Sequence, residues 1–389
     1  LFYAVTGTFT GVVVFMRVCT TAVQLLLSLW LYRTFVRILD KEYAFLLGAC
    51  YFNIVPKMIQ IPEFSNLQVW FFTVTLLALT EYDAGERGAG RFSGHPLWLV
   101  LAGIGMALGV LAYPGSLLLF LFFLAVLLRR AKASGQTIGR GVRDCLIFAG
   151  TCAACAAVWL WRVLSDISLG EFLRDLRYTV AFDPTHDMSP NAEFRIVALL
   201  RDCKTLAVLM LISLAVGLAA WRIAGKARGR RNPDARMPGG AVLAVCVILA
   251  AEAVQLFYWL VLRAGYEIPQ LHLIVALLAA ALLWRRTDGR GRGLGTGLLC
   301  SALTILVVVY MSDLGLWYAV PHGAPGVPLA LAVLIFALEK EDGGRARFWT
   351  YLLLFSMAFT SVFGKGFVLR AGRTETNTIL GIRGVIRHG

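Results

Sequence analysis

A series of long apolar segments separated by short basic loops constrains this chain more than any other feature of its sequence. A helix needs about 20 apolar residues to cross the hydrocarbon core of a bilayer, because each residue advances it by about 1.5 Å. The 389 residues are 59% hydrophobic and only 15% charged, whereas a soluble domain has roughly 25% charged residues. The sequence therefore predicts an all-α fold, a polytopic transmembrane helical bundle.

We predict about twelve membrane-spanning segments. The run from Leu97 to Leu128 is too long for one span. Tyr113-Pro114-Gly115 divides it into a tight helical hairpin, since proline interrupts a helix and glycine permits a turn. The expected spans are residues 18–36, 43–58, 63–80, 97–112, 115–128, 145–164, 204–221, 240–263, 268–284, 294–312, 326–338 and 347–364.

The Lys and Arg residues lie mostly in alternate loops, such as 129–143 and 222–236, and this asymmetry predicts the orientation. Cytoplasmic loops of membrane proteins carry the excess of basic residues. The net charge of +14 then reflects topology and contacts with membrane lipids, not nucleic-acid binding. The alternation places outside the N-terminus, residues 57–66, the Tyr113 hairpin, residues 165–204, 264–270 and 313–325, and a tail from residue 365.

The stretch from Ser165 to Lys204 is the longest polar interruption of the apolar pattern. It is either a solvated linker or a partly helical lid over a site, and we favour the lid. We expect one transmembrane domain over residues 1–389, with this lid-like loop at 165–204 and an outside tail at 365–389. An amphipathic interfacial helix is expected where charged residues alternate with Ile167, Phe172, Leu176 and Val180, and a second helix from Asn191 onward. Asp183-Pro184 and Ser189-Pro190 are expected to form turns.

No nucleotide-binding glycine loop, zinc-protease motif or nucleophile elbow is present, so polar groups at the outer ends of spans are the candidates. Glu63, where a helix re-enters the membrane, is the strongest. Its carboxylate could act as a base, hold a divalent cation or orient a sugar hydroxyl. The alternative is an ordinary carboxylate favoured by the helix dipole. Ser65 or Asn66 could cap this helix.

Further candidates are weaker. Arg370 and Arg373 could bind phosphate, since arginine presents a fork of donors, or they could belong to a solvated tail. Glu252 and Gln255 lie within a span, where an ionisable group is either functional or part of an interhelical hydrogen bond. The five His residues include no ligand-spaced pair, so no zinc site is expected. The other candidates for contacting the substrate are Asn66, Tyr113, Asp183, His186, Asp187, Glu267 and His272, and a lone His322 lies in an outer turn.

The order of these elements resembles the GT-C superfamily of integral-membrane glycosyltransferases, which includes protein O-mannosyltransferases and bacterial lipid-linked sugar transferases. The features that carry the resemblance are Phe15-Met16-Arg17 before a span ending Leu31-Tyr32-Arg33, the short pair 43–80 turning through residues 61–66, the glycine-rich 101–109 before Tyr113-Pro114-Gly115, and the long outer stretch after an ascending span.

The resemblance implies transfer of a sugar from a polyprenyl-phosphate-linked donor to a glycan or protein acceptor on the extracytoplasmic face of the cell membrane. Glu63 matches the second acidic position of the family. The principal catalytic acid would lie in a first outer loop upstream of Leu1, and we expect the sequence to be cut at both ends. The cofactor is open, with a divalent cation as the candidate.

Two alternatives from other classes stay open. A transporter or flippase would show inverted repeats and broken helices near the bilayer midplane. No clear repeat is visible, and the polar groups lie outside, apart from Glu252 and Gln255. A polysaccharide polymerase or ligase of the cell envelope would also have many spans and a long outer loop with arginines.

Overall fold

The structure, a computed structural model, describes residues 2–54, 61–86, 95–133, 137–181, 188–231, 238–262, 270–287, 289–311, 315–341 and 343–374. These residues form helices joined by turns, with no strand among them. The all-α prediction is therefore confirmed for the described residues.

A helix lies at each of the predicted spans. Six helices of the described part are long and apolar enough to cross a membrane. α3 and α11 have 13 residues each, or about 20 Å, less than the roughly 30 Å of a bilayer core. The helices are α2 (Val12–Phe35), α3 (Lys41–Asn53), α4 (Phe64–Glu86), α5 (Leu97–Ala112), α6 (Leu117–Ala133), α7 (Ile138–Leu164), α9 (Met188–Arg231), α10 (Gly240–Leu262), α11 (Leu271–Leu283), α12 (Gly289–Met311), α14 (Gly326–Glu341) and α15 (Ala346–Thr374).

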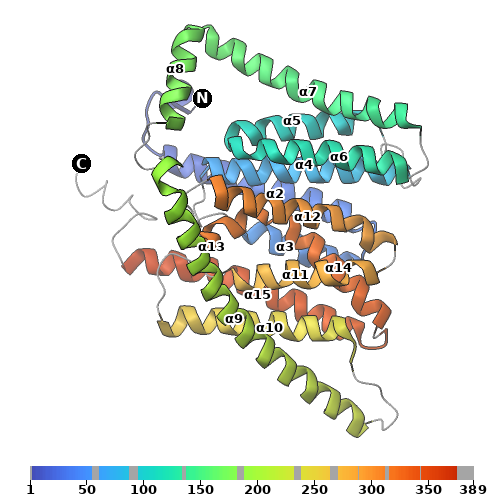
Figure 1. Cartoon of the computed structure of the whole chain (residues 1–389). Coiled ribbons are helices and arrows are strands. Elements are labelled where there is room, and N and C mark those ends of the chain that lie inside the picture. Colours follow the sequence, from blue (N-terminus) through green and yellow to red (C-terminus); the bar gives the residue numbers. More distant parts are fainter. Residues whose placement is uncertain are drawn as a thin grey trace. The chain divides into compact units, whose positions relative to one another are not determined.

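Shorter elements connect these helices (Figure 1). By its internal contacts the chain divides into two compact units. Unit 1 is Leu1–Pro62, Leu206–Leu298 and Gly326–Gly389, and unit 2 is Glu63–Thr205 and Leu299–Pro325. The prediction of one transmembrane domain stays a prediction. The short elements are α1 (Phe2–Thr6), α8 (Leu169–Ala181), α13 (Leu316–Ala319) and the 3-10 helices η2 (Pro114–Ser116), η3 (Trp284–Arg286) and η4 (Val320–Gly323).

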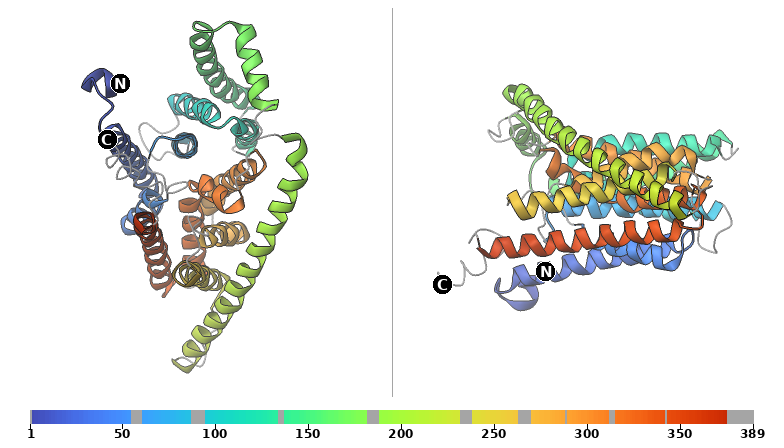
Figure 2. Two further views of the ribbon diagram at one scale, coloured as in Figure 1. Left: turned by 90° about the vertical axis from the view of Figure 1, so that its left-hand side faces the viewer. Right: turned by 90° about the horizontal axis from the view of Figure 1, so that it is seen from below.

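α14 forms the centre of unit 1. Every residue from Gly326 to Leu338 is buried, and α3, α10, α11 and α15 pack around it. A helix that is apolar on all sides is typical of a protein core or of a membrane span. Figure 2 shows α10 and α15 running alongside one another, in agreement with their contact.

Two glycines allow close packing in unit 2. α5 packs against α4 and α7. A Cβ added to Gly103 would lie 2.8 Å from the carbonyl oxygen of Phe148, and one added to Gly105 would lie 2.8 Å from Oγ1 of Thr75. Small residues are typical of such interfaces between apolar helices.

Replacing Gly103 by alanine should lower the free energy of unfolding by about 1–3 kcal/mol, because the added methyl group meets backbone that cannot turn aside. Gly150 in α7 provides a matched control, since nothing lies within 4 Å of a Cβ there. Gly150→Ala should be neutral or stabilising, because alanine is the better helix former. Thermal unfolding in detergent measures both variants. Equal melting temperatures would contradict the close approach of α5 and α7.

The predicted lid-like loop is largely helical, with α8 at the position expected for the amphipathic helix. The second predicted helix is confirmed, but α9 continues from Met188 to Arg231 without a break. Ser189-Pro190, which we expected to form a turn, lies in the first turn of α9. Proline is tolerated there because the first N–H groups of a helix have no intrahelical acceptor. The predicted turn at Asp183-Pro184 lies outside the described residues.

Ser168 and Glu171 form a capping box at the start of α8. The carboxylate of Glu171 accepts hydrogen bonds from the backbone N–H and the hydroxyl of Ser168, each at 2.9 Å. The backbone N–H of Glu171 donates to the Ser168 hydroxyl at 3.2 Å. This reciprocal pair satisfies N–H groups that the helix itself leaves without acceptors. The hydrogen bonds from Ser168 lower the pKa of Glu171 below its ordinary value.

The start of α8 should loosen at acidic pH. Because folding lowers the pKa of Glu171, the stabilisation is present above the unfolded-state value of about 4.3 and is lost as pH falls through the folded-state pKa. Protection factors from hydrogen exchange of the α8 amides, compared at neutral and acidic pH, measure this loss. Glu171→Gln should abolish the pH dependence and Asp175→Asn should preserve it. An unchanged pH dependence in Glu171→Gln would contradict this assignment.

Candidate active site

A set of polar residues in unit 2 comes from the start of α4, the end of α5 and η4. His322 is hydrogen-bonded to Gln68 and lies beside the ring of Tyr113. We define the polar cluster by these three buried residues together with the buried Asn66 and the half-buried Glu63 at the start of α4. Three of these, Glu63, Asn66 and Tyr113, are candidates from the sequence. The structure places all five residues in unit 2.

Glu63 directly precedes α4, and its carbonyl oxygen accepts the N–H of Leu67 at 2.9 Å. The carboxylate oxygen Oε1 is buried and has no hydrogen-bond partner in the part of the chain that the structure describes. Ser65 and Asn66 are buried in the first turn of α4. The expectation that one of them caps the helix is wrong, because α4 begins one residue before Ser65, at Phe64.

His322 is fully buried on η4. Its Nδ1 is hydrogen-bonded to Oε1 of Gln68, which lies 254 residues away in the sequence. An amide oxygen can only accept, so Nδ1–H of His322 donates this hydrogen bond. Gln68 thereby selects the tautomer and the orientation of the imidazole.

The ring of Tyr113 lies beside two other aromatic rings, those of Phe64 and His322. Its ring centroid is 6.4 Å from that of Phe64 and 6.1 Å from that of His322. Its hydroxyl donates to the carbonyl oxygen of Val308 at 3.4 Å. Tyr113 ends α5 in an extended conformation and Pro114 begins η2, so the predicted hairpin is confirmed.

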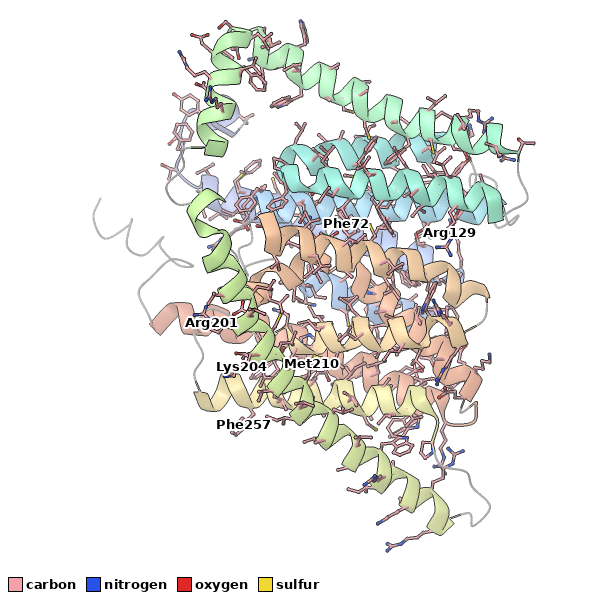
Figure 3. The ribbon with its side chains drawn as sticks, in the orientation of Figure 1. Phe72, Arg129, Arg201, Lys204, Met210 and Phe257 are labelled. Atoms are coloured by element: carbon pink, nitrogen blue, oxygen red, sulfur yellow. The ribbon has the colours of Figure 1, made fainter. Side chains whose placement is uncertain are left out.

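Asp202 of α9 holds the segment that carries His322. Its Oδ2 accepts the backbone N–H of Leu316 at 3.0 Å. A Cβ on Gly315 would lie 2.7 Å from the same oxygen, so glycine permits this approach. Figure 3 shows Arg201 and Lys204 on this part of α9, and both are exposed. The predicted lid stretch is thus tied to the segment that bears the imidazole.

The other candidates lie elsewhere. His272, the second residue of α11, is buried in unit 1, and its Nδ1 is 2.8 Å from Oε1 of Gln255. Arg370 and Arg373 lie within α15 of unit 1, so the predicted tail begins as helix up to Thr374. Asp183, His186, Asp187 and Glu267 lie outside the described residues.

Gln68, His322 and Asp202 were not selected from the sequence. Gln68 belongs to no motif, and the only signal for it was a polar residue within an apolar span. His322 was noted as a lone histidine in an outer turn, without a partner that sequence spacing could identify. Asp202 was included only as part of the polar stretch. Their partners are far away along the chain, so no local pattern joins them.

The polar cluster offers a carboxylate, two amides, a phenol and an imidazole. Such groups can hydrogen-bond to sugar hydroxyls, and a carboxylate or imidazole can accept a proton. Among the described residues, no group of three or more His, Cys, Asp or Glu side chains could hold a metal ion. No known protein family, curated protein or solved structure matches this chain at a significant level.

Proposed function

We propose that this protein is an integral-membrane glycosyltransferase of the GT-C type, with about twelve spans. It transfers a sugar from a polyprenyl-phosphate-linked donor to a glycan or protein acceptor. The active face is the extracytoplasmic side of the cell membrane, where the basic loops of the opposite side predict the start of α4 to lie.

The observation that carries this proposal is the carboxylate of Glu63. Its Oε1 is buried without a hydrogen-bond donor among the described residues. An unsatisfied buried acceptor costs about 1–3 kcal/mol, and the hydroxyl group of a substrate would satisfy it. In the proposed reaction Glu63 accepts a hydrogen bond or a proton from the acceptor hydroxyl.

The remaining parts have supporting roles in this proposal. Asn66 and Tyr113 orient sugar hydroxyls, and Gln68 holds the His322 imidazole beside them. Arg370 and Arg373 of α15 stay candidates for the donor phosphate from the sequence alone. The amphipathic α8 and the start of α9 act as the lid, which orders the sugar and limits access of water.

Transfer by the purified protein, expressed from its full-length gene, tests this function. The protein in nanodiscs is given polyprenyl-phosphate sugars labelled in the sugar, together with glycan and peptide acceptors. We expect the label to move to one class of acceptor only when donor and protein are both present. Absence of transfer from every donor, with the protein folded by thermal unfolding, would contradict the proposal.

A transporter or flippase of lipid-linked sugar is the second candidate. The observation in its favour is Glu252, a buried carboxyl in the middle of α10, because ionisable groups within spans mark transport pathways. Liposomes with a fluorescent lipid-linked sugar distinguish the two functions. A flippase equilibrates the lipid between leaflets without forming a glycosylated acceptor.

A further inference from the structure

Glu252 occupies an unusual position in unit 1. It lies in the 23-residue α10, about 18 Å along the helix axis from Gly240. The surrounding segment Gly240–Phe257 is one of the six candidate spans. The residue is 2% exposed, and neither carboxyl oxygen has a hydrogen-bond partner among the described residues.

Two uncharged side chains on neighbouring helices interact with Glu252, Thr360 on α15 and Cys50 on α3. Gln255, also uncharged, follows three residues later on α10 itself. The hydroxyl of Thr360 donates to the carbonyl oxygen of Ser356 at 3.0 Å. That hydroxyl can therefore accept a hydrogen bond from Glu252 but has no second proton to donate to it.

This environment favours a neutral carboxyl over a carboxylate. An ionised group buried without a cation costs several kcal/mol, and no Lys or Arg of the described residues forms an ion pair with Glu252. A protonated Glu252 supplies the O–H that Thr360 can accept.

Polar side chains follow Glu252 along the chain up to the start of α11, which the topology predicts to lie outside. Gln255 has a buried Nε2 without a partner in the described part, and its Oε1 accepts Nδ1–H of His272 at 2.8 Å. The buried Gln270 directly precedes α11. These groups give a proton a polar route that the apolar remainder of α10 lacks.

We propose that Glu252 binds one exchangeable proton, which reaches it past His272 and Gln255 from the start of α11. A proton is the ligand that these groups fit. Ca²⁺ and Mg²⁺ take six or more oxygen ligands, whereas Glu252 and Thr360 offer few, and Oε1 of Gln255 is already used. The site is independent of the polar cluster in unit 2 and of the sugar transfer proposed there.

Dicyclohexylcarbodiimide, an apolar reagent for protonated carboxyls, tests this proposal on the intact protein in membranes. The carboxyl gives its proton to a carbodiimide nitrogen and its oxygen adds to the central carbon. The resulting O-acylisourea rearranges to a stable N-acylurea, so the adduct retains every atom of both reactants. We expect the adduct at Glu252 near neutral pH, located by peptide mass spectrometry, and less of it as pH rises.

Controls separate the assignment from general reactivity. A water-soluble carbodiimide with an added amine should modify the exposed Asp166 and Glu171 but not Glu252. Glu252→Gln should remove the adduct, and the infrared band of a protonated carboxyl should disappear with it. Lack of the adduct and of the band in the wild-type protein would overturn the proposal. Protection of Glu252 by Na⁺ at constant pH would also overturn it, because it would show a metal-cation site.

Discussion

Replacing Glu63 by glutamine should lower the rate of sugar transfer by about 10²–10⁴-fold, the usual contribution of a positioned general base. Glutamine keeps the size of the side chain and still accepts a hydrogen bond, but it cannot take a proton. We therefore expect kcat to fall while KM for the lipid-linked donor changes little. Initial rates over a range of donor concentrations measure both constants.

A matched control distinguishes the position of Glu63 from a loss of charge. Glu42 at the start of α3 has a side chain that is 51% exposed, so Glu42→Gln should retain the wild-type rate. Glu63→Asp should recover part of the activity, because it restores the base at a shorter reach. Full transfer by Glu63→Gln would show that this carboxylate has no part in the reaction, while leaving open transfer by another base.

The second large effect, on stability, should come from replacing Asp144. This residue is buried in α7 and contacts Tyr82 of α4. Its Oδ2 accepts the hydroxyl of Tyr82 at 2.7 Å, and its Oδ1 lies 3.3 Å from Nη2 of Arg143. Arg130 lies over the Tyr82 ring with its Cζ 4.3 Å from the centroid, and it also pairs with Asp83. These contacts join three helices of unit 2.

Asp144→Ala should lower the free energy of unfolding by about 3 kcal/mol, because it leaves a buried tyrosine hydroxyl without its acceptor and opens a small cavity. Tyr82→Phe should cost less, about 1.5–3 kcal/mol, the range for a hydrogen bond to a charged group. Denaturant unfolding of the purified protein in detergent measures both.

Two comparisons test whether the loss comes from this contact. In the double variant the two effects should be less than additive, since each single change already breaks the same hydrogen bond. Asp166 forms an ion pair with Arg162 in which both side chains are mostly exposed, so Asp166→Asn should cost at most about 1 kcal/mol. Additive losses for Tyr82 and Asp144 would contradict the direct contact.

Local chemistry allowed several elements to be predicted from the sequence. Tyr113-Pro114 ends one helix and starts the next because proline has no N–H to donate. α8 could be predicted from the spacing of its apolar residues, and the other helices from their apolar runs. Both signals depend only on residues that are close together in the sequence. The predicted turn at Ser189-Pro190 is wrong. Proline favours turns, but it is equally compatible with the first turn of a helix, where this pair lies. Length and composition support six spans, so the larger number of about twelve, which counts shorter apolar runs, stays a prediction.

The sequence by itself determined an all-helical protein with long apolar segments and a polar stretch between them, because helix periodicity and hydropathy are properties of neighbouring residues. Only the tertiary structure decided that α14 is enclosed, that Gln68 orients His322, that Asp202 holds Leu316, and that Glu252 of α10 meets Thr360 of α15. Each of these depends on residues that are distant along the chain. Such contacts arise from helix packing, in which the shape and burial of whole faces select the partners.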